Sequence, residues 1–429
     1  MLEKLFDLKA SGTGVRTEIV AGITTFLTMS YIVFVNPDIL SSTGMDRNAV
    51  FVATCLAAAL GSLVMGLLAN WPIGLAPGMG LNAFFAFTVV GAMGFTWEQA
   101  LGAVFISGLV FLLLTVTGVR SWLIAGIPQS LRCAIATGIG MFLAIIALRN
   151  AGIVVANPAT LIGLGDLSQP APLLAAFGFF AIATLDALRV RGSILIGIAL
   201  VTALSILLGL TEFQGVLSLP PSLAPTFLQL DIAGALGIGL LQVVLVFVLV
   251  EVFDATGTLI GVAKRAGLIE PGKPNKLGRA LLADSTAIVA GSVLGTSSTT
   301  AYVESASGVQ AGGRTGLTAV VVAVLFLGAL FFAPLAAVVP AYATAPALLY
   351  VAGLMMRELT EIEWGDITEA TPAALTALAM PFTFSIANGL AFGFISYVVL
   401  KVATGKARSV HPATFIVAIL FVIHFAIHV

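Results

Sequence analysis

The chain has 429 residues, of which 59% are hydrophobic and only 9% are charged, and its formal net charge is −1. Soluble proteins carry about 25% charged residues, so this composition excludes a soluble enzyme and predicts an all-α protein whose helices cross a membrane many times. A net charge near zero also argues against a nucleic-acid partner. Cys55 and Cys133 stand alone in apolar stretches, so we expect neither a disulfide nor a metal site.

The chain begins with a charged segment and not with a signal peptide. Residues 1–17 contain Lys4, Lys9 and Arg16, and they lack a short apolar core followed by a small-residue cleavage site. We therefore expect residues 1–17 to be a cytoplasmic N-terminus. The protein itself is expected to be a multi-pass protein of the plasma membrane, the inner membrane of a bacterium.

Apolar segments follow one another along the rest of the chain, and a helix needs about 20 residues to cross a hydrocarbon layer of about 30 Å. Segments of suitable length are 18–38, 48–69, 98–118, 130–148, 172–188, 193–210, 237–262, 315–338, 340–356, 367–384 and 386–402. Further segments, short or interrupted by Gly, Ser and Thr, are 76–93, 280–294 and 297–312. Together they predict 14 transmembrane spans. The last apolar run, 411–428, is either a further span or an interfacial helix.

The basic residues test this count, because Lys and Arg concentrate in cytoplasmic loops. With residues 1–17 inside, 14 spans leave only Arg47 and Arg149, of 19 Lys and Arg residues, on the outer side. A miscount by one span would mix the two sides. Both ends of the 14-span region are therefore predicted to be cytoplasmic.

An internal repeat emerges when the chain is divided near residue 230, after the Pro-rich stretch LPPSLAPTF. The first span, EIVAGITTFLTMSYIVFVNP, then corresponds to the span with Glu251, and the interrupted LAPGMGLNAFFAF corresponds to GTSSTTAYVESASG. Seven spans per half is an odd number, so the halves must be inverted relative to one another. Inverted repeats with paired broken helices are typical of secondary transporters, whose substrate binds near the middle of the membrane.

Acidic side chains single out the centre of the second half. Glu251 and Asp254 lie in the apolar stretch LVFVLVEVFDATGTLIGVA, and Glu304 lies in the second interrupted segment. An ionisable group at bilayer depth costs several kcal/mol, so it is by default a hypothesis about a transport pathway. These acids are the first candidates for the site.

The two interruptions supply complementary groups. Pro77 and its neighbouring glycines prevent a continuous helix, and the Ser/Thr run of the second segment competes for backbone hydrogen bonds. Each break points a helix N-terminus with free N–H groups into the site. A small planar heterocycle suits such a site. Besides these N–H donors, the site offers the carboxylates of Glu251 and Glu304, the amide of Asn82 and the ring of Tyr302. An inorganic anion would be repelled by the two carboxylates.

Every candidate has a structural alternative. A carboxylate can cap a half-helix or bond across the core, an Asn can join membrane helices, an aromatic ring can simply pack, and a threonine can bond its own helix. The sequence leaves these alternatives open. The candidate substrate contacts are Glu251, Glu304, Asn82, Tyr302, Thr25 and Thr300, and the candidate proton-coupling residues are Glu251 and Asp254.

The whole chain resembles the AzgA-like branch of the nucleobase cation symporters, within the xanthine/uracil permease superfamily. The resemblance rests on NPDIL, GLAPGMGLNAFFAFTVVGAMG, FDATGTLIGVAKRAGL, GTSSTTAYVESASGVQAGGRTGLTAVVV and PFTFSIANGLAFGFISY. It implies proton-coupled uptake of adenine, guanine and hypoxanthine, driven by a proton gradient without a cofactor. By motif position, Asn82, Glu251, Asp254 and Glu304 fall on the substrate and coupling positions of that family.

The resemblance also implies a core domain and a gate domain. The core would comprise residues 18–118 and 231–338, and the gate residues 119–230 and 339–402, followed by a tail at 403–429. Spans of the gate carry few polar residues, which suits a sliding face against the core and an apolar surface for a homodimer surrounded by lipid. We expect the core to move against the gate during transport.

Two other functional classes compete with this reading. An anion transporter on the same inverted-repeat fold would present a cationic or neutral site where Glu251 and Glu304 stand. A membrane-embedded enzyme or a receptor would need a catalytic constellation or a sizeable soluble domain, and the sequence offers neither. The prediction is therefore a transporter and not an enzyme.

Overall fold

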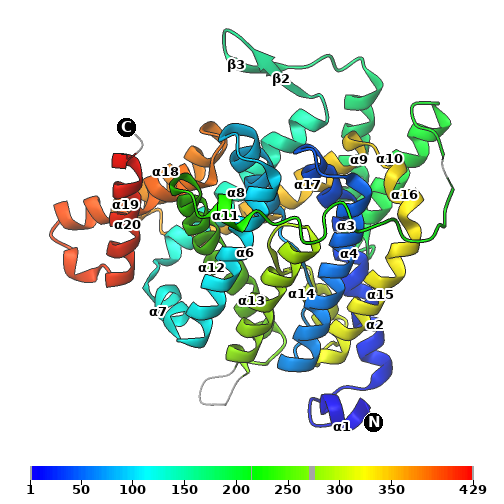
Figure 1. Cartoon of the computed structure of the whole chain (residues 1–429), viewed down its shortest axis with the longest axis horizontal. Helices are drawn as coiled ribbons and strands as arrows, with labels where there is room; N and C mark the ends of the chain where they lie inside the picture. Colours follow the sequence, from blue (N-terminus) through cyan, green and yellow to red (C-terminus); the bar gives the residue numbers. More distant parts are fainter. Residues whose placement is uncertain (1, 214, 270–275, 428–429) are drawn as a thin grey trace. The chain divides into compact units, whose positions relative to one another are not determined.

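The structure is a computed structural model that describes residues 2–213, 215–269 and 276–427 (Figure 1). The chain divides into two compact units. The first unit comprises Met1–Val116 and Asp166–Ala347, and the second comprises Thr117–Gly165 and Leu348–Val429. The sequence-based core and gate domains divide the chain differently, because they assign residues 166–230 to the gate. That division stays a prediction.

Helices make up most of the first unit. They are α1 (Leu2–Phe6), α2 (Val15–Met29), α3 (Ile32–Ser41), α4 (Arg47–Val64), α5 (Met79–Ala83), α6 (Trp97–Val116), α9 (Pro170–Ala187), α10 (Ser193–Leu207), α11 (Ile232–Ala235), α12 (Ile238–Arg265), α13 (Leu277–Leu294), α14 (Ser305–Gln310), α15 (Gly316–Ala329) and α16 (Ala333–Val338). The π-helical turns η1 (Met65–Ala69) and η2 (Phe84–Ala92) extend α4 and α5.

The second unit is also mainly helical. Its elements are α7 (Val119–Gly126), α8 (Gln129–Asn150), β2 (Val154–Asn157), β3 (Leu161–Leu164), η4 (Met356–Glu361), α18 (Ile367–Phe382), α19 (Ile386–Ala403), η5 (Ala407–Ser409) and α20 (Pro412–Ile427). The boundary between the units falls within α17 (Ala341–Met355). The antiparallel β2–β3 hairpin follows α8 and was not predicted.

Nine helical segments among the described residues are long and apolar enough to cross a membrane unaided. The remaining predicted spans are shorter or interrupted. They correspond to β1 (Leu75–Pro77) with α5 and η2, to α10, to β4 (Thr299–Ala301) with α14, and to α17 and α18. Proline explains part of this, because Pro346 lies inside α17 and Pro372 and Pro381 lie inside α18. By contrast, α13 is continuous although a shorter segment was expected there. Helix α20 has 16 residues, fewer than the about 20 of a typical span.

The two predicted interruptions meet as a pair of short strands. β1 (Leu75–Pro77) runs antiparallel to β4 (Thr299–Ala301), with Pro77 opposite Thr299. Extended backbone is tolerated at membrane depth only where its polar groups are satisfied inside the protein. Here the strands pair with each other, and Ser62 and Asp284 accept from the backbone N–H groups of Leu75 and Ala301. A short helix follows each strand, α5 after β1 and α14 after β4. The strands were not predicted, but the half-helices were.

Glycines allow the helices of the first unit to lie close together. Helix α15 lies beside α2 and α4 (Figure 1). A Cβ atom on Gly66 would come within 2.6 Å of the Gly316 carbonyl oxygen, and one on Gly22 within 2.7 Å of Val321 Cγ1. Membrane helices gain little from the hydrophobic effect, so they associate through such close small-residue contacts.

A buried carboxylate caps the start of α15. Glu18 on α2 is fully buried, and its carboxylate accepts hydrogen bonds from the backbone N–H groups of Arg314 (2.9 Å), Thr315 (3.3 Å) and Thr318 (3.3 Å). The Thr318 hydroxyl also donates to it, at 2.6 Å. A helix leaves its first N–H groups without helical partners, and a negative charge at this end is favourable. Glu18 therefore joins the first span to α15.

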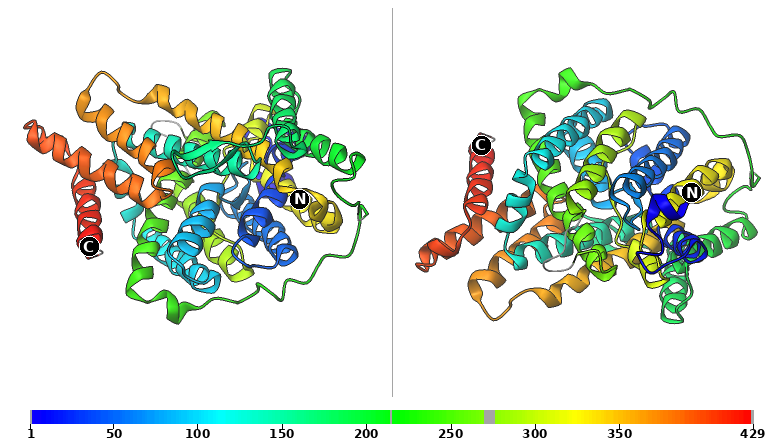
Figure 2. Two further views of the ribbon diagram at one scale, coloured as in Figure 1. Left: turned by 90° about the horizontal axis from the view of Figure 1, so that it is seen from above. Right: turned by 90° about the horizontal axis from the view of Figure 1, so that it is seen from below.

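A long extended segment joins the two sequence halves within the first unit. Residues 215–231, which include the predicted Pro-rich loop, run along the edge of this unit without regular structure (Figure 2). Backbone N–H groups of Ser218 and Asp231 donate to the carbonyls of Phe331 and Glu98, both at 3.0 Å. The segment is therefore anchored at both ends.

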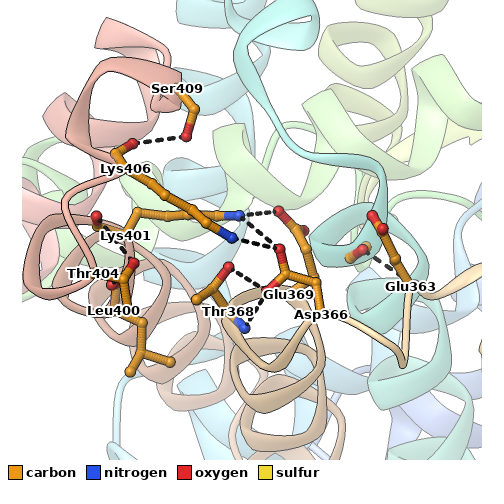
Figure 3. A network of polar contacts seen from close by, with 10 residues as sticks. Glu363, Asp366, Thr368, Glu369, Leu400, Lys401, Thr404, Lys406 and Ser409 are labelled. Atoms are coloured by element: carbon orange, nitrogen blue, oxygen red, sulfur yellow. Dashed lines mark hydrogen bonds and ion pairs between the residues drawn. The ribbon is translucent and has the colours of Figure 1, made fainter.

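Charged side chains link the ends of α18 and α19 in the second unit (Figure 3). The buried Lys401 ammonium lies 2.8 Å from Glu369 Oε1, and Lys406 Nζ lies 3.0 Å from Asp366 Oδ2. Asp366 also caps α18, since one of its carboxylate oxygens accepts from the backbone N–H of Thr368 (2.8 Å) and from its hydroxyl (2.7 Å). These ion pairs connect the start of α18 to the end of α19 and the residues just after it.

The Asp366 cap predicts a pH-dependent stability. Hydrogen bonds from Thr368 and from Lys406 hold the pKa of Asp366 well below its usual range. A carboxyl with a lowered folded-state pKa stabilises the fold above its unfolded-state pKa, about 3.9, and this contribution is lost as the pH falls through the folded-state value. We expect the difference in Tm between the wild type and Asp366→Asn, measured in detergent, to shrink below about pH 4.

The exposed Glu363 on the same loop provides the control for this experiment. Glu363→Gln should unfold at the wild-type temperature at neutral pH, whereas Asp366→Asn should unfold earlier. A difference between Asp366→Asn and the wild type that stays constant from pH 7 to pH 3 would contradict the prediction.

Candidate functional site

The predicted site residues all lie in the first unit. The elements that carry them meet around the β1–β4 pair, where α12 contacts both β4 and α14, and α14 contacts α2. The described side chains are those of Glu251 on α12, Glu304 before α14, Asn82 on α5, Tyr302 after β4, Thr25 on α2 and Thr300 on β4. Asp254 also lies on α12, but its side chain is outside the residues that the structure describes.

Glu304 stands at the second break, directly before α14, and the residue as a whole is partly exposed. Tyr31 Oη donates a hydrogen bond of 2.6 Å to Glu304 Oε1, and the Thr28 hydroxyl lies 3.4 Å from the Glu304 carbonyl oxygen. Tyr31 was not among the residues predicted from the sequence. A signal existed, because a Ser-Tyr pair interrupts the apolar first span at Ser30 and Tyr31, between α2 and α3.

Glu251 is fully buried in the middle of α12. Its Oε1 lies 3.4 Å from the hydroxyl of Ser107 on α6. The same hydroxyl lies 2.7 Å from the Val104 carbonyl oxygen, and one hydroxyl hydrogen can serve only one of these acceptors at a time. The contact of Ser107 with Glu251 is therefore the longer and weaker of its two contacts.

Asn82 is fully buried on α5, just after the first break. The Ser297 hydroxyl donates to Asn82 Oδ1, so the amide oxygen is engaged from the opposite break. The buried Nδ2 has no hydrogen-bond partner among the described residues. Leaving a buried donor unsatisfied costs about 1–3 kcal/mol, so a ligand or a water that accepts from this amide would be stabilising.

Tyr302 joins the two breaks, and Thr300 joins the second break to α13. The Tyr302 hydroxyl donates to the Pro77 carbonyl at 2.6 Å, and its backbone N–H donates to the Gly74 carbonyl at 3.0 Å. Thr300 Oγ1 donates to Asp284 Oδ1 on α13 at 3.2 Å. Asp284 was not predicted from the sequence, because it lies in an apolar segment expected to be short. Contact of Tyr302 and Thr300 with a substrate stays a prediction.

Thr25 on α2 packs against α14. It is fully buried, and a Cβ atom on Gly308 would overlap its hydroxyl and come within 2.7 Å of the Ala21 carbonyl oxygen. The Thr25 hydroxyl has no hydrogen-bond partner among the described residues. The structure thus places Thr25 at the contact between α2 and α14, and its contact with a substrate stays a prediction.

The arrangement presents two carboxylates and an amide donor beside two half-helices. One carboxylate oxygen of Glu304 accepts a hydrogen bond from Tyr31, Glu251 is buried, and Asn82 Nδ2 is a donor without a partner among the described residues. Acceptor groups of this kind bind N–H donors of a polar, uncharged ligand, and they repel anions. Binding of a heterocycle at the breaks stays a prediction.

Comparison with known proteins identifies the family. The profile described as the Permease family matches residues 16–392. The chain belongs to this family. This permease is 52% identical to adenine permease AdeP of Escherichia coli (strain K12), over 99% of this chain and 95% of that protein. It is 45% identical to guanine/hypoxanthine permease PbuG of Bacillus subtilis (strain 168), over 99% of both chains. The predicted relationship to the purine permeases is confirmed.

The fold also has solved counterparts. The permease superposes on the transmembrane domain of the cyanobacterium bicarbonate transporter BicA with a TM-score of 0.66 at 17% identity, covering 86% of this chain and 95% of that one. SLC26A9 gives a TM-score of 0.64 at 10% identity. These proteins share the fold of two inverted seven-span repeats, so the predicted fold class is confirmed. At such low identity the likeness concerns the fold alone.

Proposed function

We propose that this permease is a secondary transporter that takes up purine nucleobases, with adenine, guanine and hypoxanthine as its substrates. The observation that carries the proposal is high identity over nearly the whole length to permeases named for these bases. Glu304 supports it, because a carboxylate held at one oxygen keeps further acceptor positions for the N–H groups of a base. The anion alternative is not favoured, because an anion would be repelled by Glu251 and Glu304.

Uptake is proposed to be coupled to protons, with Glu251 and Asp254 as the proton-carrying candidates. Glu251 supports this proposal, because a carboxylate buried away from water is costly as an ion and is compensated by a proton or a partner. Its contact with Ser107 is long. Proton uptake from one side and release to the other would then accompany the passage of the base.

In the proposed transport cycle, a core domain moves against a gate domain. The core, residues 18–118 and 231–338, would carry every substrate candidate, and the gate, residues 119–230 and 339–402, would form the homodimer. The N-terminus would lie in the cytoplasm, as the distribution of Lys and Arg indicates. Glu251, Glu304 and Asn82 all lie in the first compact unit, which supports a substrate that travels with one rigid part.

The test is uptake of radiolabelled adenine, guanine and hypoxanthine by cells that lack their own purine transport, with and without a protonophore. Cells that express the permease should take up the labelled bases. Unlabelled purines should compete with this uptake, and bicarbonate should not. The protonophore should reduce it strongly, and uptake should fall between pH 5 and pH 8. Absence of uptake for all three bases would overturn the substrate class. Uptake that neither the protonophore nor the pH alters would overturn proton coupling.

A further inference from the structure

We propose that Tyr31 is a positioning residue for the substrate. Its hydroxyl holds one oxygen of the Glu304 carboxylate, so that the remaining acceptor positions of this group face the base. The inference deepens the proposed function and rests on it, because it assigns to the first span a role in presenting the carboxylate of the broken segment.

The hydrogen bond between these side chains is short and protected. Tyr31 is fully buried, and its Oη lies 2.6 Å from Glu304 Oε1. Phenol-to-carboxylate hydrogen bonds of about 2.5–2.7 Å are charge-assisted and roughly twice as strong as neutral ones. A buried phenol also needs a partner for its hydrogen. Both groups therefore gain from the contact, and neither is easily replaced by water.

One face of the first span contacts α14 and the residue directly before it. Ala21, Thr25, Thr28 and Tyr31 follow at intervals of three and four residues, which places them on one side of a helix. Ser30 and Tyr31 keep right-handed helical backbone angles (φ −64° and −55°), so this face continues across the junction of α2 and α3.

Contacts along this face fix both the backbone and the side chain near Glu304. Gly308 approaches Ala21 and Thr25 too closely for a Cβ atom. One helical turn further along α2, the Thr28 hydroxyl donates to the Thr25 carbonyl at 2.8 Å and lies 3.4 Å from the Glu304 carbonyl oxygen. Tyr31 then reaches the carboxylate itself. The carboxylate is thus held from a second element, which a purely local half-helix could not achieve.

The geometry also leaves Glu304 with room for a ligand. An ionised carboxylate has about four acceptor positions. Tyr31 occupies one of them. The residue as a whole is partly exposed. Oriented in this way, Glu304 offers acceptors only, so the base must present N–H donors to it.

Tyr31→Phe tests the proposal, because it removes the hydroxyl and keeps the ring. We expect the Kd for radiolabelled adenine, measured on purified protein in detergent, to rise about 10-fold or more, as for loss of a hydrogen bond to a charged group. Tyr342→Phe on α17, which also removes one phenol hydroxyl from the first unit, should bind as the wild type does. Wild-type affinity in Tyr31→Phe would overturn the proposal.

A double-mutant cycle separates positioning from a general structural effect. If Tyr31 acts through the carboxylate, Tyr31→Phe should cause no further loss in a Glu304→Gln background, and the two effects should not add. If the losses multiply, Tyr31 acts elsewhere and the proposal is wrong.

An infrared measurement makes the test independent of the ligand. The carboxylate stretch that disappears in Glu304→Gln should shift in Tyr31→Phe and stay in place in Tyr342→Phe. An unshifted band in Tyr31→Phe would mean that the hydrogen bond does not exist, and it would overturn the proposal. Failure of the wild type to bind any purine would count against the proposed function instead, and the infrared result would then decide on Tyr31 alone.

Discussion

Glu304→Ala is expected to abolish binding of purine bases. The variant removes the carboxylate at the second break and leaves the N–H groups of a bound base without an acceptor. Discrimination against a missing polar partner in a site built for hydrogen bonds reaches about 10⁴-fold. The substitution also leaves the Tyr31 hydroxyl without its hydrogen-bond acceptor inside the protein. We therefore expect no measurable uptake.

The measurement is equilibrium binding of labelled adenine to purified protein, with Tm as a check of folding. Glu304→Gln keeps one acceptor oxygen and should retain weak binding. The exposed Glu212, in the same unit, is the matched control, and Glu212→Ala should bind normally. Wild-type affinity in a folded Glu304→Ala protein would place the site elsewhere.

Glu18→Ala is expected to destabilise the first unit more than any other single carboxylate change. The carboxylate accepts four hydrogen bonds at the start of α15, and these donors belong to buried or partly buried groups that water cannot reach readily. Each stranded buried donor costs about 1–3 kcal/mol, so the total loss should reach about 4 kcal/mol or more. Domains are stable by only about 5–15 kcal/mol, so a large part of the protein should misfold.

Expression as a fluorescent fusion, followed by size-exclusion chromatography and thermal unfolding in detergent, checks this expectation. Glu18→Gln retains an acceptor oxygen and should lose less stability than Glu18→Ala. Glu3 on α1 is exposed, and Glu3→Ala should behave as the wild type does. An unchanged Tm in Glu18→Ala would show that the cap contributes nothing.

Much of the architecture could be predicted because its signals are local. The length of each apolar run, the placement of Lys and Arg and the odd number of spans per half depend only on the order of residues along the chain. Pro77 and the Ser/Thr run likewise marked both breaks, and the structure has short strands and half-helices there. Glu251 and Glu304 stood out because an acid is expensive in an apolar span.

The partners of these groups could not be predicted in this way. Tyr31 and Glu304 are 273 positions apart, and Glu18 and Thr318 are 300 apart. The pairing of β1 with β4 and the hydrogen bond from Thr300 to Asp284 also join segments whose separation carries no periodic pattern.

The sequence by itself thus determined that this permease is a helical membrane protein of inverted repeats with acids near the breaks, because hydrophobicity and charge act through the surrounding membrane. Only the tertiary structure decided which side chain each acid contacts. The physical reason is that a hydrogen bond needs its donor and acceptor within about 3 Å, and this distance depends on how distant spans cross. Tyr31 became a candidate only when the first span and α14 were seen together.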